Sequence, residues 1–179
     1  MLSKRRSLEN AERERLNESI YEKTINESHF KNASSVFIYI NTASEVETTR
    51  IIEYAFAKGK RVCVPVTKGD EMVFAEIKSL EGMKKSSLGI LEPESYEEAA
   101  SEKDDLFIIP GSVFDEKGHR YGFGKGYYDR YLSSCPKVTK LALCYDFQLL
   151  KEIKTEKHDI DMDIIITEKR MIYPKGGKI

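Results

Sequence analysis

Short apolar runs rich in β-branched and aromatic residues recur along the chain, separated by polar stretches. Five of these runs predict buried β-strands: residues 36–40, 61–65, 106–109, 140–144 and 164–167. Most positions within each run are apolar in unbroken succession, whereas a half-exposed strand alternates apolar and polar positions. The sheet is therefore expected to be covered on both of its faces.

Helical spacing occurs between these runs. In the first thirty residues, Leu8, Ala11, Leu16 and Ile20 are spaced three to five apart, which predicts one amphipathic helix ending near His29. Two further helices are predicted for residues 47–58 and 127–133.

The alternation of strands and helices indicates an α/β fold, namely a single three-layer α/β/α domain with a mainly parallel central sheet. No repeat or low-complexity linker interrupts residues 1–179, so we expect one domain over the whole chain. Residues 79–101 are the least patterned and are expected to form a surface excursion.

The charges nearly cancel, because 29 Lys and Arg stand against 30 Asp and Glu. Neither a nucleic acid nor an anionic membrane is therefore expected as a partner. Cys63, Cys135 and Cys144 are odd in number and form no CxxC pair, which argues against a disulfide framework or a zinc site. No apolar run approaches the ~20 residues of a membrane helix, and we expect a cytoplasmic protein that is a monomer.

The segment most informative about chemistry is the glycine-rich stretch at 110–129, which follows a predicted strand, contains five glycines and leads into a predicted helix. Glycines let backbone N–H groups converge on phosphate oxygens, and a helix N-terminus adds partial positive charge. Arg120 and Lys125 add full charges, with Arg suited to bidentate contact and Lys to a point contact. The stretch therefore predicts a phosphate-binding loop.

General nucleotide-binding motifs do not match this loop. A Walker A loop needs Ser or Thr after its lysine, whereas Gly126 follows Lys125. The dinucleotide fingerprint also fails, because Gly122, Gly124 and Gly126 simply alternate with other residues. On spacing alone, a glycine-rich structural turn entering a helix remains an alternative.

Longer strings are more specific than spacing. RYGFGKGYYDRYL follows PGSVFDEKG and precedes LALCYDFQL and then HDIDMDIIITE, while VFIYINTASEVETTRII and GKRVCVP lie upstream. In order and spacing this series resembles the 5-formyltetrahydrofolate cyclo-ligase family, also called methenyltetrahydrofolate synthetases. The resemblance extends from Leu2 to Glu168.

The resemblance implies an enzyme that uses ATP and Mg²⁺ to convert 5-formyltetrahydrofolate to 5,10-methenyltetrahydrofolate, with release of ADP and phosphate. By position, nine consecutive residues match the family's ATP-binding loop: Arg120, Tyr121, Gly122, Phe123, Gly124, Lys125, Gly126, Tyr127 and Tyr128. The five from Phe123 to Tyr127 would also face the folate, and Arg120 and Lys125 would be catalytic.

Four further residues match other site positions of the family. Thr42 and Glu47 match the positions that hold the pterin side of the substrate, and Asp129 and Asp163 match the magnesium ligands. A carboxylate can accept the N–H donors of a pterin, and Mg²⁺ commonly takes one or two carboxylates. Without the resemblance, Glu47 could instead complement a helix dipole, and the aspartates could be a helix cap and a solvated acid.

One departure concerns the beginning of the sequence. The family usually has a Lys-x-x-Leu-Arg segment that contacts ATP, about ten residues before the stretch seen here as Lys4-Arg5-Arg6, and the printed sequence starts after that position. We expect either that a few residues precede Met1 or that this ATP contact is lost. Two other functions stay open: a folate-binding module without catalysis, and a different phosphoryl-transfer or CoA-type enzyme on a similar scaffold.

Overall fold

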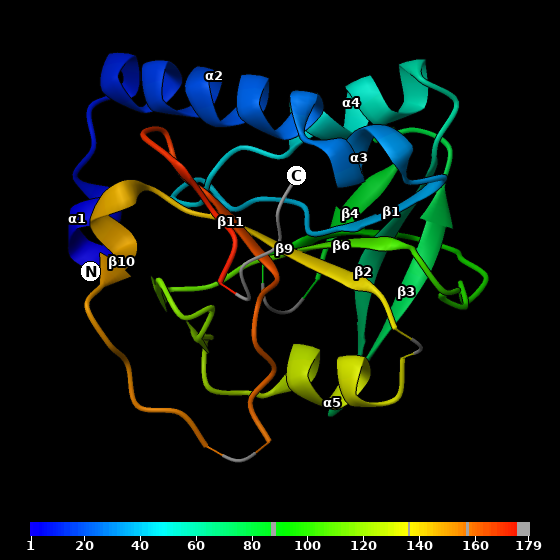
Figure 1. The fold of residues 1–179 in the computed structure, drawn as a ribbon. Coiled ribbons are helices and arrows are strands. Elements are labelled where there is room, and N and C mark those ends of the chain that lie inside the picture. Colours follow the sequence, from blue (N-terminus) through cyan, green and yellow to red (C-terminus); the bar gives the residue numbers. More distant parts are fainter. Residues whose placement is uncertain (87–88, 136, 157, 175–179) are drawn as a thin grey trace.

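A seven-stranded sheet forms the centre of the computed structural model, in the order β12-β11-β9-β6-β1-β2-β3 (Figure 1). The structure describes residues 1–86, 89–135, 137–156 and 158–174. Five strands run parallel: β1 (Ser35–Ile38), β2 (Arg61–Lys68), β6 (Leu106–Ile109), β9 (Thr139–Leu143) and β11 (Ile164–Ile166). Two antiparallel strands form the edges: β3 (Glu71–Ile77) and β12 (Met171–Ile172). All five apolar runs are strands, so the predicted mainly parallel sheet is confirmed.

The sheet is buried on both faces, as its continuous apolar runs predict. Every residue of β1, β6 and β11 is buried. Successive side chains point to opposite faces, so Val36 and Ile38 join the core on one side while Phe37 joins the core on the other. On that second side the rings of Phe37 and Phe107 stack with centroids 4.4 Å apart.

Helices cover the two faces unequally (Figure 1). One face carries α2 (Asn10–Asn26), α3 (Ser28–Asn32) and α4 (Thr49–Ala57), with α1 (Leu2–Arg6) at the end of this layer. The opposite face carries α5 (Tyr127–Ser133). The arrangement confirms the predicted α/β architecture, and α5 occupies the residues predicted for it.

The single helix predicted for the first thirty residues is wrong, because three helices occupy this region. The backbone is extended at Glu9 and again at Glu27. The carboxylate of Glu27 accepts a hydrogen bond from Phe30 N at 3.0 Å, so its side chain caps α3 and competes with continuation of α2. The apolar spacing predicts the buried face of these helices but not where they break.

The helix predicted for residues 47–58 begins two residues later, at Thr49. The delay has a local cause: Thr48 Oγ1 donates to Tyr39 O at 2.7 Å, and Thr48 N donates to Asn41 Oδ1 at 2.9 Å. These bonds fold the segment after β1 back onto the strand end. Glu47 therefore lies in a loop instead of a helical turn.

Smaller elements surround the sheet. Within residues 79–101, β4 (Met83–Lys85) and β5 (Leu91–Pro93) form a short hairpin. A second small sheet joins β7 (Val113–Asp115), β8 (Arg120–Tyr121) and β10 (Leu149–Leu150), and a 3₁₀ turn η1 (Asp146–Gln148) precedes β10. This small sheet carries one end of the glycine-rich loop, because β8 ends at Tyr121.

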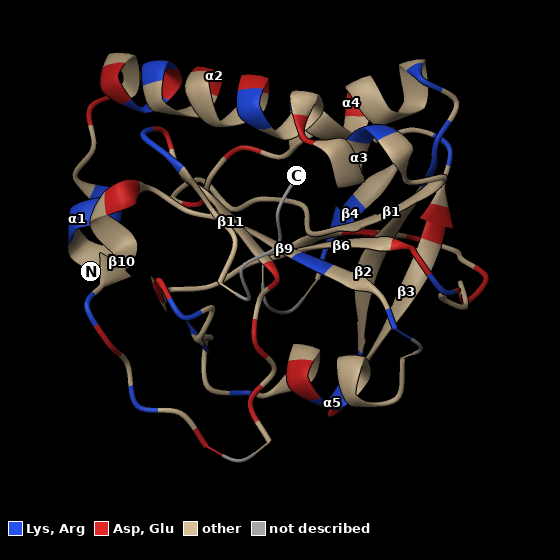
Figure 2. Ribbon diagram, in the orientation of Figure 1, with Lys and Arg blue, Asp and Glu red and all other residues tan. Residues whose placement is uncertain are grey.

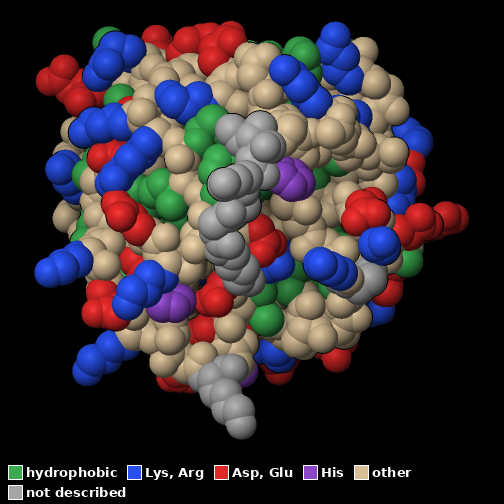
Figure 3. Space-filling model, viewed as in Figure 1, with side chains coloured by type: hydrophobic (Ala, Val, Ile, Leu, Met, Phe, Trp, Pro, Cys, Tyr) green, Lys and Arg blue, Asp and Glu red, His purple; other side chains and the backbone are tan. Residues whose placement is uncertain are grey.

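Basic and acidic side chains are interspersed on α2 and along the loops (Figure 2), and neither sign dominates the face seen in Figure 3. This distribution agrees with the near-zero net charge of the sequence. In the part of the chain that the structure describes, none of the helices has the length and apolar character needed to cross a membrane.

Candidate active site

The glycine-rich loop between β8 and α5 depends on glycine at two positions with left-handed backbone conformation. Gly124 has φ +86° and Gly126 has φ +62°, and Gly126 is the residue that immediately precedes α5. Other L-residues are strained in this region, whereas glycine is not. The loop residues Tyr121, Phe123, Gly124 and Lys125 are exposed.

Arg120 is buried beneath this loop instead of facing solvent. Its Nη2 donates to both carboxylate oxygens of Asp129 at 2.8 Å, and its Nη1 donates to Pro110 O at 3.3 Å. A Cβ atom on Gly122 would lie 2.9 Å from Arg120 Nη1, so glycine permits the close approach. Arg120 therefore fastens the start of the loop to the first turn of α5.

The two adjacent tyrosines have different surroundings. The hydroxyl of Tyr127 donates to Gly69 O at 3.1 Å, which ties the loop to the turn between β2 and β3. The hydroxyl of Tyr128 is buried and has no hydrogen-bond partner among the described residues. Burial raises the pKa of Tyr128, with the Glu45 carboxylate acting in the same direction and Arg120 opposing it. Tyr128 is thus held protonated, with the Arg120 guanidinium carbon 5.8 Å from the centroid of its ring.

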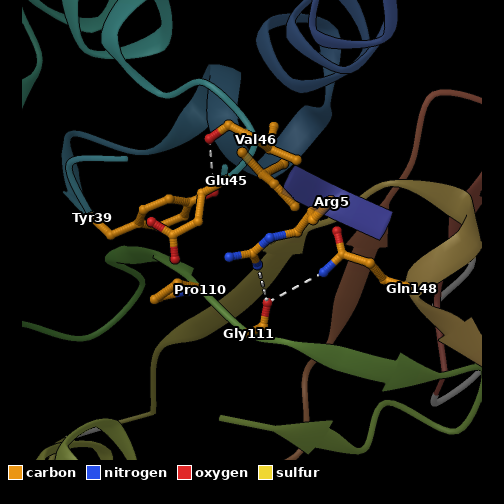
Figure 4. Close-up of a pocket in the computed structure, with 8 residues that line it drawn as sticks. Arg5, Tyr39, Glu45, Val46, Pro110, Gly111 and Gln148 are labelled. Carbon is orange, nitrogen blue, oxygen red and sulfur yellow. Dashed lines mark hydrogen bonds between the residues drawn. The ribbon is translucent and has the colours of Figure 1, made fainter. Parts of the chain in front are cut away.

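A narrow cavity, too tight in this structure to admit a water molecule, lies beside the loop at the carboxyl ends of β1, β6 and β9 (Figure 4). The chain extends the sheet to one side of β1 and then crosses to the other side through β6, so the strand order reverses between β1 and β6. In open α/β sheets, ligands bind at this reversal. The lining residues are Arg5, Tyr39, Glu45, Val46, Pro110, Gly111, Leu143 and Gln148.

Glu45 is the carboxylate of this cavity. Its Oε2 accepts hydrogen bonds from Thr42 N at 2.8 Å and from Thr42 Oγ1 at 2.9 Å, which orients the side chain. Burial raises the pKa of the cavity residue Tyr39, and the charge of Glu45 raises it further. Thr42 therefore acts on the cavity by holding Glu45.

Glu47, which sequence comparison proposes as the pterin-binding acid, is absent from the described lining of the cavity. Its backbone N donates to Asn17 Oδ1 at 3.3 Å, under α2. The sequence does contain a signal for Glu45, because a Thr followed three residues later by Glu is the pattern in which the two side chains bond locally.

Arg5, from the basic run Lys4-Arg5-Arg6, also lines the cavity. Only 3% of Arg5 is exposed. Its guanidinium carbon lies 5.8 Å from the centroid of the Phe123 ring, so α1 and the glycine-rich loop meet at this point.

The predicted magnesium ligands each contact a cation of the protein. Asp129 pairs with Arg120 and also accepts from Ile160 N at 3.2 Å. Asp163 pairs with Lys140 Nζ at 2.6 Å. Among the described residues, no three His, Cys, Asp or Glu side chains cluster as metal ligands would. Carboxylates suit Mg²⁺, but this arrangement does not fit a preformed magnesium site, because the charge of each acid is already matched.

Lys125 is exposed, with Nζ 5.7 Å from the centroid of the Tyr127 ring. The structure thus brings Glu45 and Arg5 together at the cavity, with Phe123 next to Arg5. It places Lys125 on the exposed loop surface and Glu47 outside the described cavity lining.

A model of the 5-formyltetrahydrofolate cyclo-ligase family matches residues 1–168. The chain belongs to this family. Two cyclo-ligases are similar in sequence: a probable 5-formyltetrahydrofolate cyclo-ligase of Caenorhabditis elegans is 31% identical over 178 residues, covering 90% of this chain and 85% of that protein. The 5-formyltetrahydrofolate cyclo-ligase of Mus musculus is 33% identical over 171 residues, covering 87% and 84%.

Solved structures agree with the family assignment. The NMR structure of 5,10-methenyltetrahydrofolate synthetase from Aquifex aeolicus matches with a TM-score of 0.86 and 31% identity, covering 99% of this chain and 91% of that chain. A 5,10-methenyltetrahydrofolate synthetase from Mycoplasma pneumoniae, 24% identical with a TM-score of 0.76 over 93% of each chain, shares the fold. The resemblance of the sequence to the cyclo-ligase family is confirmed.

Proposed function

We propose that this protein catalyses the ATP-dependent cyclisation of 5-formyltetrahydrofolate to 5,10-methenyltetrahydrofolate, with release of ADP and phosphate. The observation that carries the proposal is the match to the cyclo-ligase family over residues 1–168. The structure adds support from the spatial arrangement of the site, which sequence similarity does not give. A glycine-rich loop of the kind that binds phosphate lies beside a cavity with an oriented carboxylate, at the strand ends where α/β proteins bind ligands.

The cavity marks the proposed pterin side of the site, and binding of the ring requires the cavity to widen, because it is too narrow here for a water molecule. A pterin ring presents N–H donors on one edge, and an ionised carboxylate is an acceptor for two of them. Glu45 is held in place by Thr42 and lines the cavity, whereas Glu47 does not. We therefore assign pterin recognition to Glu45, and to Thr42 a role in orienting it.

The exposed loop is the proposed ATP side. The loop is exposed at Phe123, Gly124 and Lys125, where backbone N–H groups and the Lys125 ammonium would contact the triphosphate. The sequence suggests that Arg120 contacts phosphate directly, but in the structure this side chain has another role. Its Nη2 is bonded to Asp129, so Arg120 positions the loop in the structure, and contact with phosphate requires it to exchange partners.

The chemistry follows from the substrate. The formyl oxygen of a formamide is a poor leaving group, so N10 of the folate cannot displace it directly. Transfer of the γ-phosphoryl group to that oxygen breaks the bond between the γ-phosphorus and ADP and gives an N5-iminium phosphate. N10 then attacks the formyl carbon, which is held close to it, and gives up its proton. Phosphate leaves with the former formyl oxygen as the methenyl bridge forms.

Magnesium stays a prediction at Asp129 and Asp163. When bound with ATP, Mg²⁺ would supply charge neutralisation for the phosphates. Its binding requires that Asp129 and Asp163 release Arg120 and Lys140 at least in part. A cytoplasmic location and a monomeric state likewise stay predictions.

The decisive experiment uses 5-formyltetrahydrofolate labelled with ¹⁸O in the formyl group. We expect ADP release that depends on this substrate, appearance of the methenyl product in the absorbance spectrum, and recovery of the label in inorganic phosphate. Label recovered in water would show that ATP hydrolysis does not activate the formyl oxygen. Binding of 5-formyltetrahydrofolate without ADP release would show a folate-binding module instead of an enzyme.

A further inference from the structure

Arg5 is a buried cation at the candidate active site to which sequence comparison gives no role. Its guanidinium extends from α1 into the cavity, between Glu45 and Gln148 (Figure 4). Nη1 donates to Gly111 O at 3.3 Å and Nη2 donates to Ser44 Oγ at 3.1 Å. The side chain is therefore held at both terminal nitrogens.

The hydrogen bonding of Arg5 is incomplete. Its Nε is buried and has no partner among the described residues, and the two terminal nitrogens each use one of their two hydrogens. An unsatisfied buried donor of a charged group is destabilising, and such a group in a native structure calls for a cause, such as an ordered water, an ion or a functional role. An acceptor atom of a ligand would supply what the protein does not.

Glu45 indicates what kind of ligand this is. The carboxylate of Glu45 and the guanidinium of Arg5 face the same cavity with opposite charges, yet no ion pair joins them among the residues described here. Two such groups side by side match a planar ring edge on which an acceptor lies next to donors. The pterin ring of 5-formyltetrahydrofolate has this edge, with the carbonyl oxygen on C4 beside N3–H and the 2-amino group.

We infer that Arg5 is a substrate-binding residue that donates a hydrogen bond to the C4 carbonyl oxygen of the pterin, beside Glu45, which accepts from the N–H donors. The inference rests on the proposed function, because it takes 5-formyltetrahydrofolate as the ligand. The Phe123 ring centroid lies 5.8 Å from the guanidinium carbon of Arg5, so the glycine-rich loop is next to this side chain. Arg5 then donates to the acceptor of the ring, the C4 oxygen, and Glu45 accepts from its N–H donors.

The alternative is that Arg5 only fastens α1 to the loops that contain Gly111 and Ser44. The two roles differ in how they respond to the ligand. A fastening residue affects stability and all ligands alike, whereas a donor to the C4 oxygen discriminates between ligands that differ at C4. An analogue with a 4-amino group in place of the carbonyl presents a donor where the natural substrate presents an acceptor.

The test measures, by calorimetry without ATP, the affinities of 5-formyltetrahydrofolate and of its 4-amino analogue. We expect the ratio of the two affinities, natural over analogue, to fall by roughly ten- to hundredfold in Arg5→Met relative to the unmodified protein. Arg6→Met is the matched control, because Arg6 is the exposed neighbour on the same helix, and it should leave the ratio unchanged.

A second variant covers the case in which Arg5→Met does not fold. Ser44→Ala removes one acceptor that orients Arg5 and should lower the ratio by roughly two- to tenfold. An unchanged ratio in the folded variants, with weaker binding of both ligands, would assign Arg5 to fastening α1 and overturn the inference. Absence of 5-formyltetrahydrofolate binding by the unmodified protein would overturn the proposed function itself.

Discussion

Arg120 and Asp129 close the glycine-rich loop on itself, because one guanidinium nitrogen donates to both oxygens of the carboxylate at 2.8 Å. The pair is largely buried, with 5% of the Arg120 side chain and 18% of the Asp129 side chain exposed. The two residues are nine positions apart and lie on either side of the exposed loop. The geometry makes them a fastening for the loop in the absence of ligand.

We expect Asp129→Asn and Arg120→Met each to destabilise the fold by about 3 kcal/mol, because removal of one partner leaves the other charge buried and unpaired. Urea unfolding of the two single variants and the double variant measures this, and the double variant should lose less than the sum. Full additivity would show that the two side chains do not act as a pair.

Arg120→Lys keeps the charge but loses the planar fork, and we expect kcat/KM to fall by roughly ten- to thousandfold.

The position of the pterin-binding acid is tested by a matched pair of variants. Glu45→Gln should lower kcat/KM and folate affinity by roughly ten- to hundredfold, because a hydrogen bond to a charged acceptor is replaced by a neutral one. Glu47→Gln should leave both nearly unchanged, because Glu47 does not line the described cavity. Steady-state kinetics with 5-formyltetrahydrofolate decides between them. A larger loss in Glu47→Gln would restore the assignment made from sequence.

Magnesium dependence offers a separate test of the two aspartates. If Asp163 contacts Mg²⁺ once ATP is bound, Asp163→Asn should raise the Mg²⁺ concentration needed for half-maximal turnover. The control is Asp161→Asn, two residues earlier on the same segment. A titration curve for Asp163→Asn that overlays that of the unmodified protein would leave Asp163 with only its ion pair to Lys140.

Asp115 predicts how stability depends on acid. This buried carboxylate accepts hydrogen bonds from Lys117 N, His119 N, His119 Nδ1 and Ile153 N, all between 2.9 and 3.1 Å. Burial opposes its ionisation, but the bonds from Ile153 and His119 outweigh burial and hold the pKa of Asp115 below its ordinary value of 3.8.

Because the folded pKa of Asp115 is the lower one, its contribution to stability is complete above pH 3.8 and is lost as pH falls through the folded pKa. We expect Asp115→Asn to cost about 1–3 kcal/mol at neutral pH, since an amide cannot accept at both positions. The variant should also show a shallower loss of stability below pH 4. Urea unfolding at several pH values checks both, and parallel curves for the two proteins would contradict the assignment.

The strands were predictable because burial on both faces forces an unbroken apolar run, as in Val36-Phe37-Ile38. The edge strand β3 was missed because it is only partly buried and carries Glu71 and Glu76, so its pattern resembles a loop. The break before α3 was missed because it depends on the side chain of Glu27, which accepts a local hydrogen bond from Phe30 N.

The sequence was sufficient to locate the candidate site along the chain, but not to predict which of its side chains contact one another. Glycine spacing and string similarity both led to residues 120–129. Arg120 reads as a free cation in the sequence, and its pairing with Asp129 appears only when the loop is folded. Glu45 and Glu47 are both acidic and two residues apart, and the irregular backbone that places Glu45 in the cavity has no period from which this could be read.

The hydrogen bond from Tyr127 to Gly69 O has a thermal consequence. Gly69 belongs to the turn of a hairpin whose outer strand, β3, has only one neighbour in the central sheet, and such edges open at lower free energy than the interior. Arg130 Nη2 also donates to that turn, at Asp70 O. We therefore expect fraying of the hairpin on heating to loosen the loop before the core unfolds, so that heat would reduce catalysis before it unfolds the sheet.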